Sequence, residues 1–257
     1  MTERIFEMLK GCSTSTRNFP PTILYNESWL LRIILDWFSN HKTENYALTF
    51  LNGAIWFSEA ALPSQFLNSP SKDRKLAEGW SIADGVIGHF EVGKGHKIDL
   101  SFRSGGTQLV VLEAKMFSPL ANRTSNTKNY DQTARIVACI AETLFRANHH
   151  PTEMAHLGFY ILAPASQIDG ATFVSKISRD SIKEKVEQRV KEYVEAGDGK
   201  KNDWYFNYFL PMLLKIELGA LKWEDVIQEI ERNDPISANS IRQFYNQCVN
   251  FGKRPSA

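Results

Sequence analysis

The stretch that most constrains the fold is the apolar run at residues 109–115, LVVLEAK. Its four leading apolar residues, two of them β-branched, predict a strand that is covered on both faces. Because side chains alternate along a strand, Glu113 and Lys115 point to the same face at its end. Burying such charges costs on the order of several kcal/mol unless they are paired or bind a metal. The end of this strand is therefore a candidate active site.

The composition describes an ordinary soluble globular protein, with 43% hydrophobic and 23% charged residues in 257. The net charge is +1, so a nucleic-acid-binding surface would have to be a local one. The three cysteines lie far apart and match neither a metal-ligand spacing nor a disulfide framework. No signal peptide is recognisable, and no stretch approaches the ~20 apolar residues of a membrane span. These features predict a cytoplasmic protein without a membrane segment.

Hydrophobic periodicity predicts helices and then strands in the first half of the chain. Residues 1–20 are expected to hold a short helix and a linker, and helices are expected at residues 26–38 and 43–61. Glu59 continues the apolar stripe of the second of these. It lies either at an exposed helix end or beside the acids of a sheet. Three strands follow at residues 86–92, 96–102 and 108–116, and the glycine-containing links between them predict an antiparallel meander.

The second half of the chain is predicted to be mainly helical. A strong amphipathic helix at residues 130–148 leads to a buried strand at 157–162, which should lie parallel to the strand at 108–116. The pattern from Pro164 to the end is helical. We therefore expect an α/β core at residues 43–165, a helical N-terminal extension at 1–42, and a helical C-terminal part at 166–257 packed on the core.

Asp99 is the acid expected to join Glu113. If the strands at 96–102 and 108–116 are hairpin neighbours, the two carboxylates approach to within ~5–6 Å. Carboxylates this close repel unless a cation lies between them, and magnesium prefers oxygen ligands. Asp84 and Glu91 are competing acids, each more typical of a turn or a strand edge. The alternative is a solvated sheet face that carries an ordinary cross-strand ion pair.

The order helix, three antiparallel strands, helix, strand, with Asp99 followed by Glu113-Ala114-Lys115, resembles the PD-(D/E)XK nuclease superfamily, which has the restriction-endonuclease-like fold. The resemblance covers about residues 43–163. Acid-x-Lys occurs three times in the chain, but only the copy at Glu113 lies on an apolar strand. Ile98 stands where many members have a proline. Gln132 resembles a glutamine that some branches carry on the following helix.

The resemblance implies metal-dependent hydrolysis of phosphodiester bonds in nucleic acid, with DNA the expected substrate, in restriction, defence or repair. Asp99, Glu113 and the Ala114 carbonyl would bind Mg²⁺ or Mn²⁺, and Lys115 would position the nucleophilic water. Gln132 and Glu59 are further candidate catalytic residues.

Basic residues around this stretch are the expected nucleic-acid contacts. Eight basic and four acidic residues lie between residues 94 and 146. Arg123 and Lys128, in a polar loop at 118–129 that should order on nucleic acid, and Arg135 are the candidates. Two other classes of function remain open: a catalytically inactive binding module on this fold, and an interaction protein that uses the aromatic helix at 204–218. A homodimer or a partner subunit is compatible with each.

Overall fold

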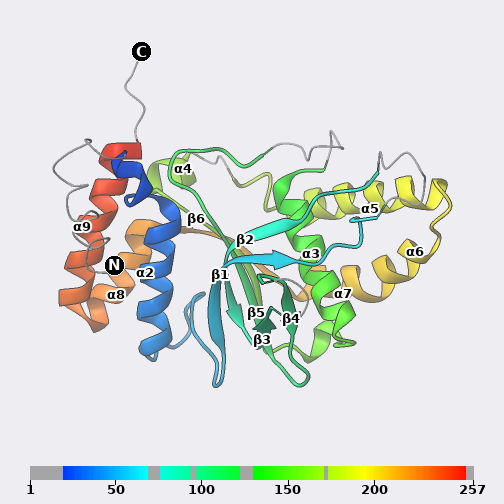
Figure 1. Ribbon diagram of the computed structural model, residues 1–257, viewed down its shortest axis with the longest axis horizontal. Helices are drawn as coiled ribbons and strands as arrows, with labels where there is room; N and C mark the ends of the chain where they lie inside the picture. Colours follow the sequence, from blue (N-terminus) through cyan, green and yellow to red (C-terminus); the bar gives the residue numbers. More distant parts are fainter. Residues whose placement is uncertain (1–19, 69–75, 94–96, 122–129, 171–172, 253–257) are drawn as a thin grey trace, which may run out of the picture.

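A central five-stranded sheet organises the molecule, and helices cover both of its faces (Figure 1). The computed structural model describes residues 20–68, 76–93, 97–121, 130–170 and 173–252. The strand order is β1-β2-β5-β6-β7. The pairs β1–β2 and β2–β5 are antiparallel, and the pairs β5–β6 and β6–β7 are parallel. The chain is therefore a mixed α/β protein, which agrees with the α/β class predicted from the sequence.

The strands of this sheet are β1 (Ile55–Leu62), β2 (Ser81–Gly88), β5 (Gln108–Ala114), β6 (His156–Ala163) and β7 (Glu217–Lys222). A separate hairpin is formed by β3 (Phe90–Val92) and β4 (Leu100–Phe102). The longer helices are α2 (Glu27–Asn40), α3 (Gln132–Arg146), α5 (Arg179–Glu195), α8 (Trp223–Asn233) and α9 (Pro235–Gly252). The shorter ones are η2 (Pro21–Ile23), η3 (Pro151–Glu153), α4 (Ala165–Asp169), α6 (Lys200–Trp204), the π-helical turn η4 (Tyr205–Phe209) and α7 (Leu210–Lys215).

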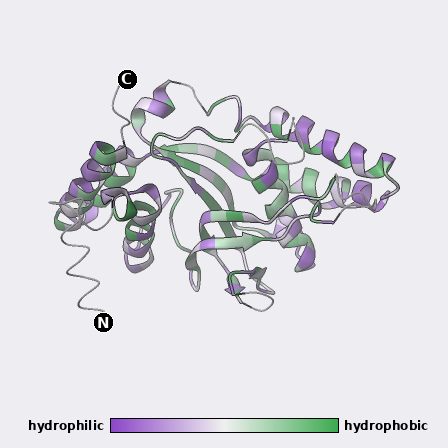
Figure 2. Ribbon diagram, turned by 45° about the horizontal axis from the view of Figure 1, so that its top comes forward, coloured by the Kyte–Doolittle hydropathy of each residue, from purple (hydrophilic) through white to green (hydrophobic). Residues whose placement is uncertain are grey.

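Two hydrophobic cores lie on the two faces of the sheet. On one face α3, α5, α6 and α7 pack on residues such as Val111 and Phe159. On the other face α2, α8 and α9 pack on residues such as Val110 and Leu162. The strands are hydrophobic along most of their length, whereas α5 carries long hydrophilic stretches (Figure 2). None of the helices in the described ranges is long and apolar enough to span a membrane.

The elements with the strongest local patterns are confirmed. The helix predicted at 26–38 is α2, whose cap Asn26 accepts a hydrogen bond from the Trp29 backbone N–H. The helix predicted at 130–148 is α3, capped in the same way by Asp131. The strand predicted at 157–162 is β6, and it pairs with β5 in parallel. The helix predicted within residues 1–20 falls almost wholly outside the described residues.

The helix predicted at residues 43–61 is wrong, because this segment contains the strand β1. Its apolar spacing imitates a helix, but Gly53 adopts a left-handed φ of 81° and the chain turns there. The residues that follow, Ile55, Trp56 and Phe57, have high strand propensity and pair with β2.

The three-stranded meander is also wrong in its pairing. β2 pairs directly with β5, and the β3–β4 hairpin is an excursion between them. Gly88 explains the departure, because a Cβ at this position would lie 2.2 Å from the carbonyl oxygen of Gln108. The backbones of the two strands thus approach closely at the end of β2, and the chain leaves the sheet there.

The strand β7 was not predicted, since residues 166–257 read as helical throughout. It forms the fifth strand by pairing with β6, and the Tyr160 ring lies where Gly158 and Gly219 leave space for it. Tyr160 also donates a hydrogen bond to Glu217 at 2.5 Å. β7 thus belongs to the central sheet, and α2 packs on that sheet. The division of the chain into parts at residues 42 and 165 stays a prediction.

Candidate functional site

The sheet splits between β2 and β5 at the end where β5 finishes. The β2–β5 pairing stops at Gly85 and Leu112, whereas β5 continues to pair with β6 as far as Ala114. The Asp84 side chain fills the split by accepting a hydrogen bond from the Ala114 backbone N–H at 2.7 Å. A carboxylate is therefore held against the last residues of the central strand.

Glu113 lies beside this carboxylate and is almost fully buried, with 1% of its surface exposed. Its Oε1 accepts hydrogen bonds from Lys115 Nζ at 2.5 Å and from Gln132 Nε2 at 2.6 Å. Its Oε2 is buried and has no hydrogen-bond partner among the residues that the structure describes. A buried acceptor without a partner is costly, which favours a ligand at this position.

Burial and neighbouring charge change the acidity of both groups. Burial, and then the charge of Asp84, raise the pKa of Glu113 to about 7, although Lys115 and Gln132 oppose the rise. Burial also raises the pKa of Asp84 above its usual range, while the hydrogen bond from Ala114 lowers it. A buried acid whose pKa is raised by burial and by a neighbouring acid is typical of a functional site.

The backbone of Lys115 is fixed from two sides. Its N–H donates to the Leu162 carbonyl of β6 at 2.8 Å, and its carbonyl accepts from Trp223 Nε1 at 2.9 Å. Trp223, the first residue of α8, is fully buried. The C-terminal helices therefore help to hold the lysine that follows the central strand.

Glu59 reaches the same region from β1. The β1–β2 register is the same on either side of it, so Glu59 lies opposite Asp84. Its φ of 60° is left-handed, which is unusual for a residue other than glycine and indicates local strain. Ser58 and Glu59 both contact Arg32 of α2, at 2.9 Å and 3.3 Å. The charge of Glu59, and more weakly that of Glu27, raises the pKa of Asp84.

Asp99 does not join this cluster, and the prediction that it faces Glu113 is wrong. β4 pairs with β3, not with β5, and Asp99 forms an isolated bridge to Ala61 at the outer side of β1. There it lines a cavity of about 270 Å³ together with Thr143 and Arg146 of α3. The structure brings Asp84 to Glu113 instead.

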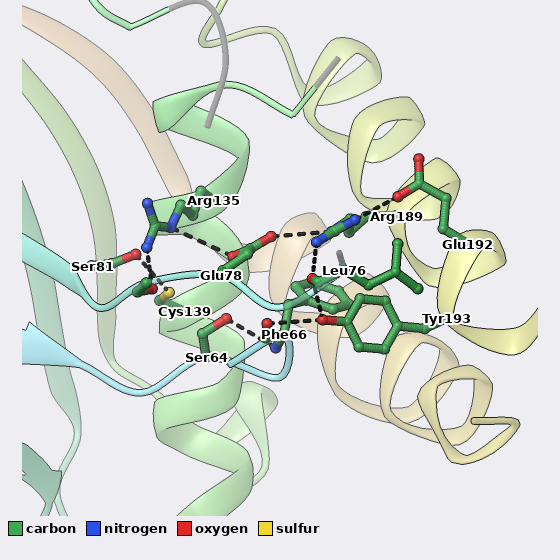
Figure 3. Close-up of polar contacts among 11 residues, drawn as sticks. Ser64, Phe66, Leu76, Glu78, Ser81, Arg135, Cys139, Arg189, Glu192 and Tyr193 are labelled. Atoms are coloured by element: carbon green, nitrogen blue, oxygen red, sulfur yellow. Dashed lines mark hydrogen bonds and ion pairs between the residues drawn. The ribbon is translucent and has the colours of Figure 1, made fainter. Parts of the chain in front are cut away.

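The remaining predicted residues have different placements. Ala114 and Gln132 lie at the cluster, as the hydrogen bonds above describe. Arg135 is engaged by the buried Glu78, with Nε 3.5 Å from Oε2, and it also donates to the Gly79 carbonyl. Figure 3 shows Glu78 between Arg135 and Arg189 of α5.

Arg123, Lys128 and most of the loop at 118–129 lie outside the described residues. Glu91, the other competing acid, lies 4.0 Å from Arg103 in the β3–β4 hairpin.

Sequence reasoning gave Asp84 too little weight and missed Arg32, Glu27 and Trp223. The sequence did contain a signal for Asp84. This acid interrupts an otherwise apolar run from Ile82 to Ile87, in the same way as Glu113 ends the apolar run of β5. Arg32 and Glu27 could not be identified without the packing of α2 on the sheet, because a charge on a helix surface is ordinary.

The carboxylates are oxygen ligands of the kind that magnesium and manganese prefer. Within the described part of the chain, no group of three or more His, Cys, Asp and Glu side chains is arranged to hold a metal ion. A magnesium site does not require three, since it commonly uses one or two carboxylates and keeps several waters. The unsatisfied Oε2 of Glu113 beside Asp84 fits such a site.

Comparisons with protein-family models, with curated proteins and with solved structures found no match to this chain.

Proposed function

We propose that this protein is a metal-dependent phosphodiesterase that hydrolyses nucleic acid, with DNA as the expected substrate. The observation that carries the proposal is the meeting of Asp84 and Glu113 in the split between β2 and β5. Lys115 lies 2.5 Å from Glu113 there, and one oxygen of Glu113 lacks a partner within the described ranges.

The arrangement along the chain supports the same proposal. α2, the strands β1, β2 and β5, then α3 and β6 occur in the order helix, three antiparallel strands, helix, parallel strand. This is the order on which the resemblance to the PD-(D/E)XK nucleases rests, with β1 now as the first strand. Asp84 then takes the place of Asp99 as the acid of the strand before Glu113-Ala114-Lys115.

Asp84 and Glu113 are the residues that would hold a divalent cation, with Glu59 and the Ala114 carbonyl as further candidates. When bound, a magnesium or manganese ion would neutralise the clustered carboxylates and polarise a phosphodiester. Lys115 would donate a hydrogen bond to the attacking water or to the developing charge on the phosphate. Gln132 would hold the Glu113 carboxylate in place by its hydrogen bond.

A cleavage assay tests the proposal. Labelled single-stranded and duplex DNA and RNA are incubated with the protein in Mg²⁺ or Mn²⁺, with EDTA as the blank. Cleavage that depends on the metal is expected. Lys115→Ala should abolish it while the melting temperature stays within a few degrees, because Glu113, with a pKa of about 7, can take up a proton when the lysine is lost.

Lys201→Ala is the matched control, since Lys201 has the same side-chain exposure of 14% and is also paired to an acid, Asp198. The Lys201→Ala variant should cleave the nucleic acid as the wild type does. Absence of metal-dependent cleavage on every substrate would reject the proposal. Retained cleavage in Lys115→Ala would reject the role of the lysine.

A further inference from the structure

We propose that Trp29 and Arg32, on the side of α2 next to the candidate site, form a platform for an unpaired nucleotide. The indole would stack on its base and the guanidinium would bind its phosphate. This inference rests on the proposed function and names its substrate class, a single strand or a duplex with an unpaired end.

Trp29 is exposed where the other aromatic side chains of α2 are buried. It has 42% of its surface exposed, whereas Trp37 has 6% and Phe38 has 1%. Exposing an indole forfeits the favourable burial of a large apolar surface, so the position favours a binding role. Stacking on aromatic side chains is the usual way in which proteins hold unpaired bases.

Arg32 supplies the positive charge beside this ring. Its guanidinium carbon lies 5.0 Å from the centre of the Trp29 ring, within the range of a cation–π contact. Its side chain keeps 27% of its surface exposed, and its partner Glu59 keeps 46%. A partly exposed ion pair of this kind contributes little to stability, so a phosphate can compete with Glu59 for the guanidinium.

The position of the pair connects it to the candidate site. Arg32 contacts Ser58 and Glu59, and Glu59 lies opposite Asp84. A nucleotide stacked on Trp29 would therefore have its backbone near the split that holds Asp84. A continuous duplex does not offer a free base face, which is why the platform selects an unpaired nucleotide.

Binding of fluorescein-labelled single-stranded DNA of mixed sequence tests the platform. The measurement is fluorescence anisotropy in Ca²⁺, with the duplex of the same sequence as the second probe. Trp29→Ala should weaken binding of the single strand by about 5- to 150-fold. Its effect on the duplex should stay below about twofold, because a paired base cannot stack on the indole.

Arg32 has a separate readout, the salt dependence of binding. Arg32→Ala should lower the log–log slope for the single strand by about 0.7, the value for one phosphate contact. Arg32→Lys should keep the slope, because it keeps the charge. The matched controls lie on the other side of the sheet: Phe206→Ala, with Phe206 61% exposed, and Arg146→Ala, with Arg146 52% exposed and paired to Glu142. Both should bind like the wild type.

The platform is rejected if Trp29→Ala binds the single strand like the wild type, or if it weakens the duplex equally. An unchanged slope in Arg32→Ala rejects the phosphate contact. If these variants have no effect while metal-dependent cleavage persists in the wild type and is lost in Glu113→Gln, the platform alone fails. If the wild type neither binds nor cleaves any strand, the proposed function fails with it.

Discussion

At the scale of single residues, the surroundings of Glu113 set its state of protonation. Its carboxyl is buried, accepts hydrogen bonds from Lys115 and Gln132, and faces the charge of Asp84. Burial and Asp84 outweigh the lysine and the glutamine, so the pKa of Glu113 rises to about 7 from an ordinary value of 4.5. Near neutral pH without a cation, a proton can relieve the repulsion between the two acids.

This shift makes stability depend on pH. Between about 4.5 and about 7 the folded protein binds the Glu113 proton more tightly than the unfolded chain, so this carboxyl lowers stability as pH rises through that window. The full effect is on the order of 3 kcal/mol. Urea unfolding of the wild type and of Glu113→Gln from pH 4 to pH 8 measures it.

The variant should gain stability relative to the wild type as pH rises through this window, and the gain should level off above it. Glu78, whose burial also raises its pKa to about 7, is present in both proteins and cancels in the difference. A difference that stays constant with pH would contradict the assignment. Magnesium should stabilise the wild type above pH 7 and have little effect on the variant.

At the scale of elements, β1 is distorted where it carries Glu59. The left-handed φ of 60° turns the side chain toward Arg32, on the same side as that of its neighbour Ser58, without changing the register with β2. Ordinary alternation would place the two neighbours on opposite faces. The strain thus places the Glu59 carboxylate on the side of the sheet where α2 packs.

A pair of substitutions measures this strain. At most strand positions glycine is less stable than alanine by about 0.5–1 kcal/mol. At Glu59 the order should reverse, with Glu59→Gly more stable than Glu59→Ala by about 1 kcal/mol, because only glycine adopts this φ freely. Ser58→Gly and Ser58→Ala provide the control and should show the ordinary order. The free energy of unfolding in urea gives both comparisons, and the ordinary order at Glu59 would show that its backbone is not strained.

At the scale of the whole molecule, local sequence patterns predicted the helices and strands that local interactions stabilise. The buried strand at 109–115, the helices α2 and α3, and the parallel strand β6 were recognisable because their apolar periodicity and caps lie within a few residues of each other. The pairing of β2 with β5 depends on a close backbone approach at Gly88, which no local pattern reveals. β7 was missed because it is a strand only in contact with β6.

The residues of the candidate site were likewise predictable only in part. Glu113 and Lys115 were predicted because they end a strongly patterned strand, and Gln132 was predicted from the resemblance to the nuclease superfamily. Asp99 was preferred over Asp84 on the assumption that neighbours in sequence are neighbours in the sheet. The β3–β4 excursion breaks that assumption, and the choice of acid follows from the strand order.

The choice between Asp84 and Asp99 as the metal ligand can be tested directly. Mn²⁺ binding should be measured by titration calorimetry for the wild type, Asp84→Asn and Asp99→Asn at pH 8, where Glu113 is ionised. We predict that Asp84→Asn weakens binding by about tenfold or more, because it removes a charged ligand. Asp99→Asn should bind like the wild type. Wild-type affinity in Asp84→Asn, or no binding by the wild type, would contradict the proposed metal site.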